Sequence, residues 1–165
     1  MFTINNLKTF KRLIFAIIFL SFFLPAYVSI TVPVLGIAGY RDEIINVSAI
    51  QFIIGLKFKY EPEEGEYRVI IEPLTIIIFI FTIVGFFLPN VKNLHSILAG
   101  ISLVLLLFVK AIFDNRILTG SYGLAGVRYK FGYWSMFLLF GLIIFLDRIT
   151  AKQKEEIKEN NIVKD

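Results

Sequence analysis

The chain of 165 residues contains no cysteine, one histidine and one tryptophan. The lack of cysteine excludes disulfide bonds, thiolate metal sites, iron–sulfur clusters and cysteine nucleophiles. Charged residues are also scarce at 18%, whereas hydrophobic residues reach 57%, above the roughly 45–50% of an ordinary soluble domain. A water-soluble domain of this length could not bury so much Phe, Ile and Leu, so a soluble globular enzyme, a disordered chain and a collagen-like chain are excluded. The composition indicates a membrane protein of one domain.

Four apolar segments approach or reach the length that crosses a bilayer, which is roughly 20 residues. They cover residues 10–27, 73–89, 94–113 and 133–149. The first segment could also be a cleaved signal peptide, because Lys8, Lys11 and Arg12 precede an apolar stretch of suitable length. Ala26 followed by Tyr27 is a poor cleavage site, which favours an uncleaved span.

The distribution of charge favours a topology with both termini in the cytoplasm. Three of the first twelve residues are basic and none is acidic. The first outer loop, residues 28–72, carries seven carboxylates, and the second outer loop covers residues 114–132. The polar tail, residues 151–165, would then lie on the cytoplasmic side with the N-terminus.

The outer loops show the alternation of apolar and polar residues that is typical of β-strands. The alternation is found in residues 28–34, 56–60, 67–71 and 127–133. Turn-forming residues at 61–65 separate the second run from the third, which predicts a hairpin. We expect the runs at 56–60, 67–71 and 127–133 to share a single antiparallel sheet of three or four strands, with its aromatic face on the outer end of the helices.

The predicted fold is an all-α membrane bundle of four helices with a small extracytoplasmic antiparallel β-sheet. Four spans, a long strand-bearing first outer loop, a tight inner turn and a shorter second outer loop resemble the claudin-like tetraspan layout. The claudin first-loop motif of Trp residues and a Cys pair is absent. Three short elements resemble those of small bacterial four-pass membrane proteins, namely Phe23-Leu24-Pro25, Ile54-Gly55 and Gly132-Tyr133-Trp134. This resemblance implies an integral protein of the bacterial cytoplasmic membrane and says little about activity.

Polar residues at the ends of the spans are the first candidates for a site. Glu72 opens the second span and Lys110 lies near the end of the third, so we expect the two to form a pair near the outer interface. Such a pair would be structural or part of an ion or substrate pathway, and Lys110 could instead snorkel to the interface. His95 follows the tight inner turn without an Asp, Glu or Cys cluster nearby in the sequence. We expect it to be an interfacial residue rather than a ligand.

Two further groups of residues predict contacts. Thr75, Thr82 and Gly85 lie on one face of the second span and predict close helix packing there. The basic residues of the outer strands predict an electropositive surface for a partner protein. This predicted patch consists of Lys57, Lys59, Arg68, Arg128 and Lys130.

No pattern in the sequence is typical of catalysis, since a Ser/His/Asp set, a Gly-rich phosphate loop and metal-ligand spacing are all absent. We therefore expect no enzyme activity, no cofactor, no metal and no binding of nucleic acid. The expected function is that of an accessory or assembly subunit that contacts another membrane protein or a second copy of itself. Two alternatives stay open, a small transporter or channel component and an immunity-type protein against a membrane-active toxin.

Overall fold

The computed structural model describes residues 4–25, 27–36, 39–58, 68–87, 93–120 and 126–162. Within these ranges the chain is mostly helical, with a three-stranded antiparallel sheet and a separate two-stranded hairpin. The elements follow the order α1 (Ile4–Ser21), β1 (Val28–Gly36), β2 (Gly39–Val47), α2 (Ala49–Ile54), β3 (Leu56–Phe58), β4 (Arg68–Ile70), α3 (Pro73–Phe87), α4 (Leu94–Gly120), β5 (Gly126–Tyr129) and α5 (Phe131–Ile162).

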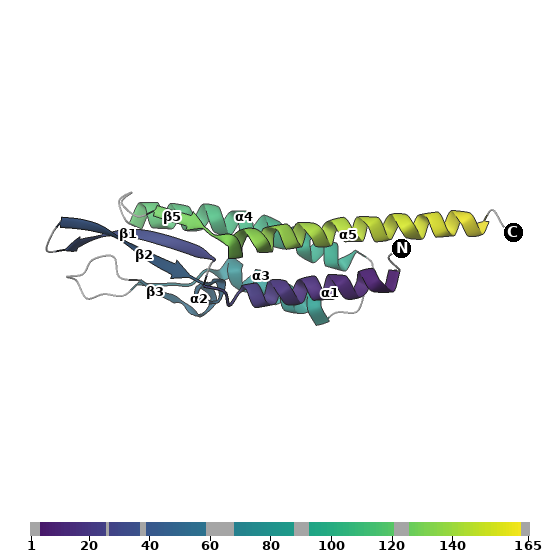
Figure 1. The fold of residues 1–165 in the computed structure, drawn as a ribbon, viewed down its shortest axis with the longest axis horizontal. Coiled ribbons are helices and arrows are strands. Elements are labelled where there is room, and N and C mark those ends of the chain that lie inside the picture. The colour runs from purple at the N-terminus through teal and green to yellow at the C-terminus, as the bar shows by residue number, and fades with distance from the viewer. Residues whose placement is uncertain are drawn as a thin grey trace.

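The long helices form a bundle in which each packs against two neighbours. Helix α1 contacts α3 and α5, and α4 contacts the same two helices. Both termini lie at one end of this elongated bundle, and the strands lie at the opposite end (Figure 1). We call the first end the inner end and the second the outer end. Large buried side chains along the bundle, among them Phe15, Phe22, Phe113 and Phe140, form its core.

Helix α3 shows how the sequence sets the packing of the bundle. Pro73 occupies its first position, where the missing N–H is not needed. The buried residues Thr75, Thr82 and Gly85 share one face of α3, as the sequence predicts. A Cβ at Gly85 would lie 2.5 Å from two ring carbons of Phe15. Glycine therefore permits the close approach of α3 to α1 at this point.

Two helices in the described part of the chain are long and apolar enough to cross a membrane. They are Leu94–Arg116 in α4 and Phe131–Gln153 in α5, each of 23 residues. Helix α3 is also apolar but has only 15 residues, and α1 has 18.

The helix boundaries differ from the predicted spans. Helix α1 begins at Ile4 and ends at Ser21, where the backbone turns through a hydrogen bond from Phe22 N to Phe19 O. Helices α4 and α5 continue to Gly120 and Ile162, well beyond the predicted ends at 113 and 149. Polar residues follow the apolar runs in both helices without a breaker, so the helices extend past the hydrophobic segment.

The hairpin of β3 and β4 is confirmed, with Leu56 opposite Ile70 and Phe58 opposite Arg68. The single sheet is wrong, because β5 pairs with β1 instead of joining this hairpin. Strand β2, which pairs with β1 from Val28↔Val47 to Gly36↔Gly39, is not among the predicted strands. The turn at 61–65 between β3 and β4 lies outside the described residues.

The predicted strand at 127–133 is too long. Strand β5 ends at Tyr129, and α5 begins two residues later. The carbonyl of Lys130 accepts hydrogen bonds from Tyr133 N and Trp134 N, which starts the first turn of α5. Phe131 therefore lies on a helix and is 75% exposed, rather than facing the bundle from a strand.

Candidate functional site

The inner end of the bundle contains a buried ion pair. Lys11 of α1 is only 4% exposed, and its Nζ donates a hydrogen bond to Oδ1 of Asp147 on α5. Asp147 Oδ2 also accepts hydrogen bonds from Ser96 N at 3.0 Å and from Ser96 Oγ at 2.6 Å. One carboxylate thus connects α1, α4 and α5. We call Lys11, His95, Ser96 and Asp147 the inner polar cluster.

His95 lies in the core beside this ion pair, not at an interface as the sequence predicts. Its side chain is 2% exposed, and its ring centroid is 5.7 Å from that of Phe15. Its Nε2 atom is buried and has no hydrogen-bond partner among the described residues. The imidazole is removed from water, with the Phe15 ring of α1 among its neighbours.

At the outer end, Glu72 and Lys110 each have a different partner from the predicted one. Glu72 Oε2 accepts a hydrogen bond from Arg116 Nη1 at 3.1 Å. Lys110 Nζ donates to Asp114 Oδ2 at 2.6 Å. No ion pair joins Glu72 to Lys110 among the described residues. The reason is the length of α4, which continues past residue 113 and places Asp114 and Arg116 on the helix instead of in a loop.

Glu72 is nearly inaccessible, with 1% of its surface exposed. Burial raises the pKa of its carboxyl group, and the nearby Arg116 guanidinium lowers it by a smaller amount. The backbone of Glu72 is also fixed, because its N–H donates to Phe52 O and its carbonyl accepts from Thr75 N. Glu72 therefore connects α2, α3 and α4 at the base of the strands.

Three tyrosines, Tyr27, Tyr129 and Tyr133, pack together where the strands meet the bundle. The Tyr129 and Tyr133 ring centroids are 4.5 Å apart, and those of Tyr27 and Tyr133 are 5.6 Å apart. Tyr129 Oη donates to Asp114 Oδ1 at 3.0 Å, and Tyr133 Oη donates to the carbonyl of Leu106 at 2.9 Å. Burial raises the pKa of Tyr27. Burial and, as a smaller cause, the Asp114 carboxylate raise the pKa of Tyr129. Both phenols stay protonated at neutral pH.

The predicted basic patch is divided between two sheets. Arg128 is exposed on β5. Lys130 comes directly after that strand, and its Nζ donates a hydrogen bond to Asn46 Oδ1 at 2.8 Å. Lys57 and Arg68 belong to the β3–β4 hairpin. In its register Lys57 lies opposite Val69 and Arg68 lies opposite Phe58. Lys59 lies outside the described residues. The division follows from the pairing of β5 with β1 rather than with the hairpin.

The partners Asp114, Arg116 and Asp147 are not among the residues predicted from the sequence. Asp147 lies inside the predicted span 133–149, and the expected topology already places it at the same end of the bundle as Lys11. Among the described residues, no group of three or more His, Asp or Glu side chains could hold a metal ion. Of the ion pairs among the described residues, Lys11–Asp147 and Arg116–Glu72 connect different elements, whereas Lys110–Asp114 lies within α4.

No protein-family model matches the chain, and no curated protein or solved structure is significantly similar to it. The resemblance to claudin-like tetraspan proteins stays a prediction.

Proposed function

We propose that the chain is an integral membrane protein that crosses the bilayer four times, with both termini in the cytoplasm. In this proposal it works by binding another membrane protein, as an accessory or assembly subunit, and carries out no chemistry of its own.

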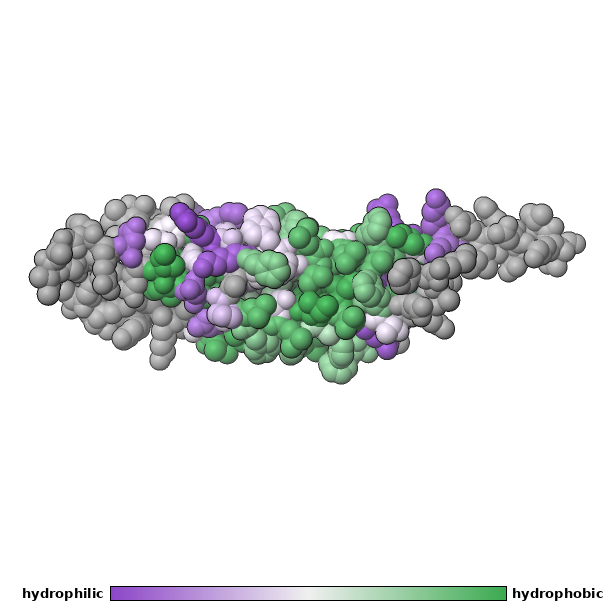
Figure 2. Space-filling model, in the orientation of Figure 1, coloured by the Kyte–Doolittle hydropathy of each residue, from purple (hydrophilic) through white to green (hydrophobic). Residues whose placement is uncertain are grey.

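The exposed apolar surface of the helices supports the membrane part of this proposal. On the face shown in Figure 2, hydrophobic residues cover the middle of the bundle and hydrophilic residues border them on both sides. Soluble monomers rarely expose apolar patches of more than a few hundred Å², whereas a bilayer would cover this surface. Each long helix contributes large exposed side chains, namely Leu13 and Leu20 on α1, Ile80 and Phe87 on α3, Leu107 and Phe108 on α4, and Leu138 and Phe145 on α5.

The short helix α3 is compatible with this arrangement. Its 15 residues extend about 22 Å at 1.5 Å per residue, which is less than the ~30 Å of an average hydrocarbon core. A short span is accommodated by local thinning of the bilayer at a modest cost. The adjacent α4 is long enough to cross by itself.

The observation that carries the partner-binding part is the edge strand β2. It has nine residues and is bonded to β1 on one side only within the described part of the sheet. Ile44, near its middle, is 63% exposed. A long edge strand with an exposed apolar residue is a template for an added strand. The occupant that fits is an extended extracytoplasmic segment of another membrane protein.

Substitution of Ile44 tests this proposal. The chain carrying an affinity tag is extracted in mild detergent, and the stoichiometry of the co-purifying protein is measured. Ile44→Lys should lower the amount of partner several-fold, because a lysine on an edge strand opposes strand addition. Ile54→Lys is the matched control, because Ile54 is 72% exposed on α2 and not on β2. Equal partner recovery with both variants, or a chain that purifies alone, would contradict the proposal.

Buried polar atoms without partners favour a second function, that of a small transporter component. Within the described residues these atoms are His95 Nε2, Ser102 Oγ and Thr75 Oγ1. Buried polar groups usually have a hydrogen-bond partner, so a permeating solute or proton could bind there. Solute or proton flux into liposomes that contain only this chain, abolished by His95→Phe, would replace the first proposal with this one.

A further inference from the structure

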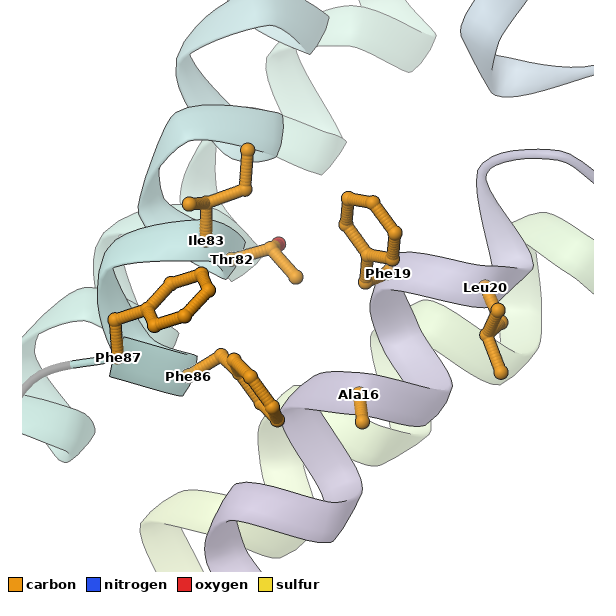
Figure 3. A pocket seen from close by; sticks show the side chains of 7 residues that line it. All are labelled: Ala16, Phe19, Leu20, Thr82, Ile83, Phe86 and Phe87. Atoms are coloured by element: carbon orange, nitrogen blue, oxygen red, sulfur yellow. The ribbon is translucent and has the colours of Figure 1, made fainter.

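A pocket of about 310 Å³ opens between α1 and α3 (Figure 3). Its lining comes from both helices and consists of Ala16, Phe19, Leu20, Thr82, Ile83, Phe86 and Phe87. The one polar side chain in this set, Thr82, donates its hydroxyl hydrogen bond to the carbonyl of Ile78 at 2.8 Å. The pocket therefore offers no free polar group to an occupant, and only an apolar occupant fits it.

The sizes of the neighbouring residues explain why the pocket is open. Gly85 allows the Phe15 ring to lie directly against α3, so the two helices approach closely beside the pocket. Ala16, the next residue of α1, is small and leaves the space next to this contact unfilled. Phe86 and Phe87 form a rigid wall on α3, with ring centroids 5.0 Å apart.

Arg12 extends this apolar pocket with a positive charge. Arg12, Ala16, Phe19 and Leu20 are spaced by four, seven and eight residues, which places them on one face of α1. Arg12 is exposed and lies one turn, about 6 Å, nearer the inner end than Ala16. Helical side chains tilt towards the N-terminus, so the guanidinium reaches further towards the interface. No carboxylate forms an ion pair with Arg12 in the part of the chain that the structure describes.

We propose that this pocket binds one acyl chain of an anionic phospholipid from the cytoplasmic leaflet, whose phosphate is held by Arg12. The order of the groups matches that of a phospholipid, with the charge at the interface and the hydrocarbon deeper in the bilayer. A positive charge beside an apolar lining favours a phospholipid over an apolar helix of a partner or a second copy.

Native mass spectrometry of the chain in mild detergent tests the site, with phosphatidylglycerol and phosphatidylcholine as the added lipids. The wild-type chain should retain one phospholipid and prefer phosphatidylglycerol. Ala16→Leu fills the pocket and should lower retention by about tenfold, the factor expected from losing about two buried methylene groups. Ala111→Leu makes the same change on an exposed position of α4 and should retain lipid as the wild type does.

The charge is tested separately from the pocket. Arg12→Gln should retain lipid but lose the preference for phosphatidylglycerol, whereas Arg148→Gln, an exposed arginine on α5, should keep it. Equal retention by Ala16→Leu and Ala111→Leu would overturn the proposal. Because the chain has no cysteine, Leu20→Cys provides a unique crosslinking position at the pocket. A disulfide-linked dimer of that variant, or a crosslink to another protein, would also overturn it.

This inference rests on the proposed insertion into a membrane, and the two can fail separately. A chain released from membranes by alkaline carbonate would refute the insertion. A chain that resists carbonate but retains no phospholipid would refute only the lipid site.

Discussion

Lys11 and Asp147 are 136 positions apart in the chain, and yet they form a buried ion pair that joins α1 to α5. Their side chains are only 6% and 13% exposed. A charge at such a site is stable only while its partner is present, because removal of one partner leaves the other desolvated without compensation. The pair therefore makes the packing of the first helix conditional on that of the last.

Replacement of Lys11 should reveal this dependence. Lys11→Met keeps most of the side-chain volume but leaves the Asp147 carboxylate buried without its cation. We expect the free energy of unfolding to fall by about 3–5 kcal/mol, measured by thermal unfolding in mild detergent. Lys152→Met is the control, since Lys152 is exposed on α5, and it should change stability by less than about 0.5 kcal/mol.

A double variant distinguishes a lost ion pair from a poorly tolerated methionine. Lys11→Met combined with Asp147→Leu removes both charges, and apolar replacements of buried pairs are often neutral or stabilising. The double variant should regain most of the stability that the single variant loses. The double-mutant cycle should therefore be non-additive. Additive losses would mean that the two residues act independently.

Gly85 is a second position at which one residue sets how closely two helices pack. Gly85→Ala places a Cβ 2.5 Å from the ring of Phe15, which is itself fully buried. We expect a loss of about 1–3 kcal/mol, as is typical of overpacked cores. Gly100→Ala, on α4, meets nothing within 4 Å and should keep or slightly raise stability, because alanine favours the helix.

A smaller side chain at position 15 should reduce the loss of stability that Gly85→Ala causes. Phe15→Leu removes Cε1 and Cζ, the two ring carbons nearest to a Cβ at Gly85, so Gly85→Ala should cost less in that background. A Gly85→Ala variant as stable as Gly100→Ala would show that α1 and α3 are not in close contact.

Local signals in the sequence were enough for several of these elements. The hairpin of β3 and β4 follows from two alternating runs separated by turn residues, and the buried face of α3 follows from the spacing of Thr75, Thr82 and Gly85. In each case the interacting residues are close in sequence or lie on one element. Patterns of period two or 3.6 describe such relationships directly.

Pairings between distant elements could not be predicted in this way. Alternation predicts strands at residues 28–34 and 127–133, but it specifies neither their partners nor the end of the second strand at Tyr129. Strand β2 was hidden because Arg41, Asp42 and Glu43 interrupt its alternation. Likewise, Lys11 could be matched to Asp147 only once α1 was known to lie beside α5.

Glu72 should make stability depend on pH. Burial raises the pKa of its carboxyl group above the ordinary value of 4.5, so the folded chain holds a proton that the unfolded chain has already released. The contribution of Glu72 to stability therefore falls as the pH rises from that value through the raised pKa. Glu72→Gln keeps an acceptor for Arg116 but cannot titrate.

The measurement is the difference in melting temperature between wild type and Glu72→Gln from about pH 4.5 to about pH 7.5. The wild type should lose stability relative to the variant as the pH rises. Asp42→Asn is the control, because Asp42 is an exposed carboxylate on β2. The difference in melting temperature between wild type and Asp42→Asn should not show the trend with pH that is expected for Glu72→Gln. A difference between wild type and Glu72→Gln that is independent of pH would show that Glu72 does not titrate differently on folding.

The topology provides the most direct test of the membrane assignment. The strands lie at the opposite end of the bundle from both termini (Figure 1), so a bilayer around the helices would separate Ile44 from Lys152. The turn between α3 and α4 should share the side of Lys152, because these helices form an antiparallel hairpin. Ile44, Asn93 and Lys152 are all exposed, and the chain has no cysteine, so each can carry a unique thiol.

A membrane-impermeant maleimide applied to intact cells should label Ile44→Cys but neither Asn93→Cys nor Lys152→Cys. Permeabilised cells, in which all three thiols are accessible, provide the control for reactivity. Both inner positions should become labelled there, because their protection comes from the bilayer and not from burial in the protein. Labelling of Ile44→Cys and Asn93→Cys from the same side would contradict a four-span bundle, since α3 would then not cross the membrane.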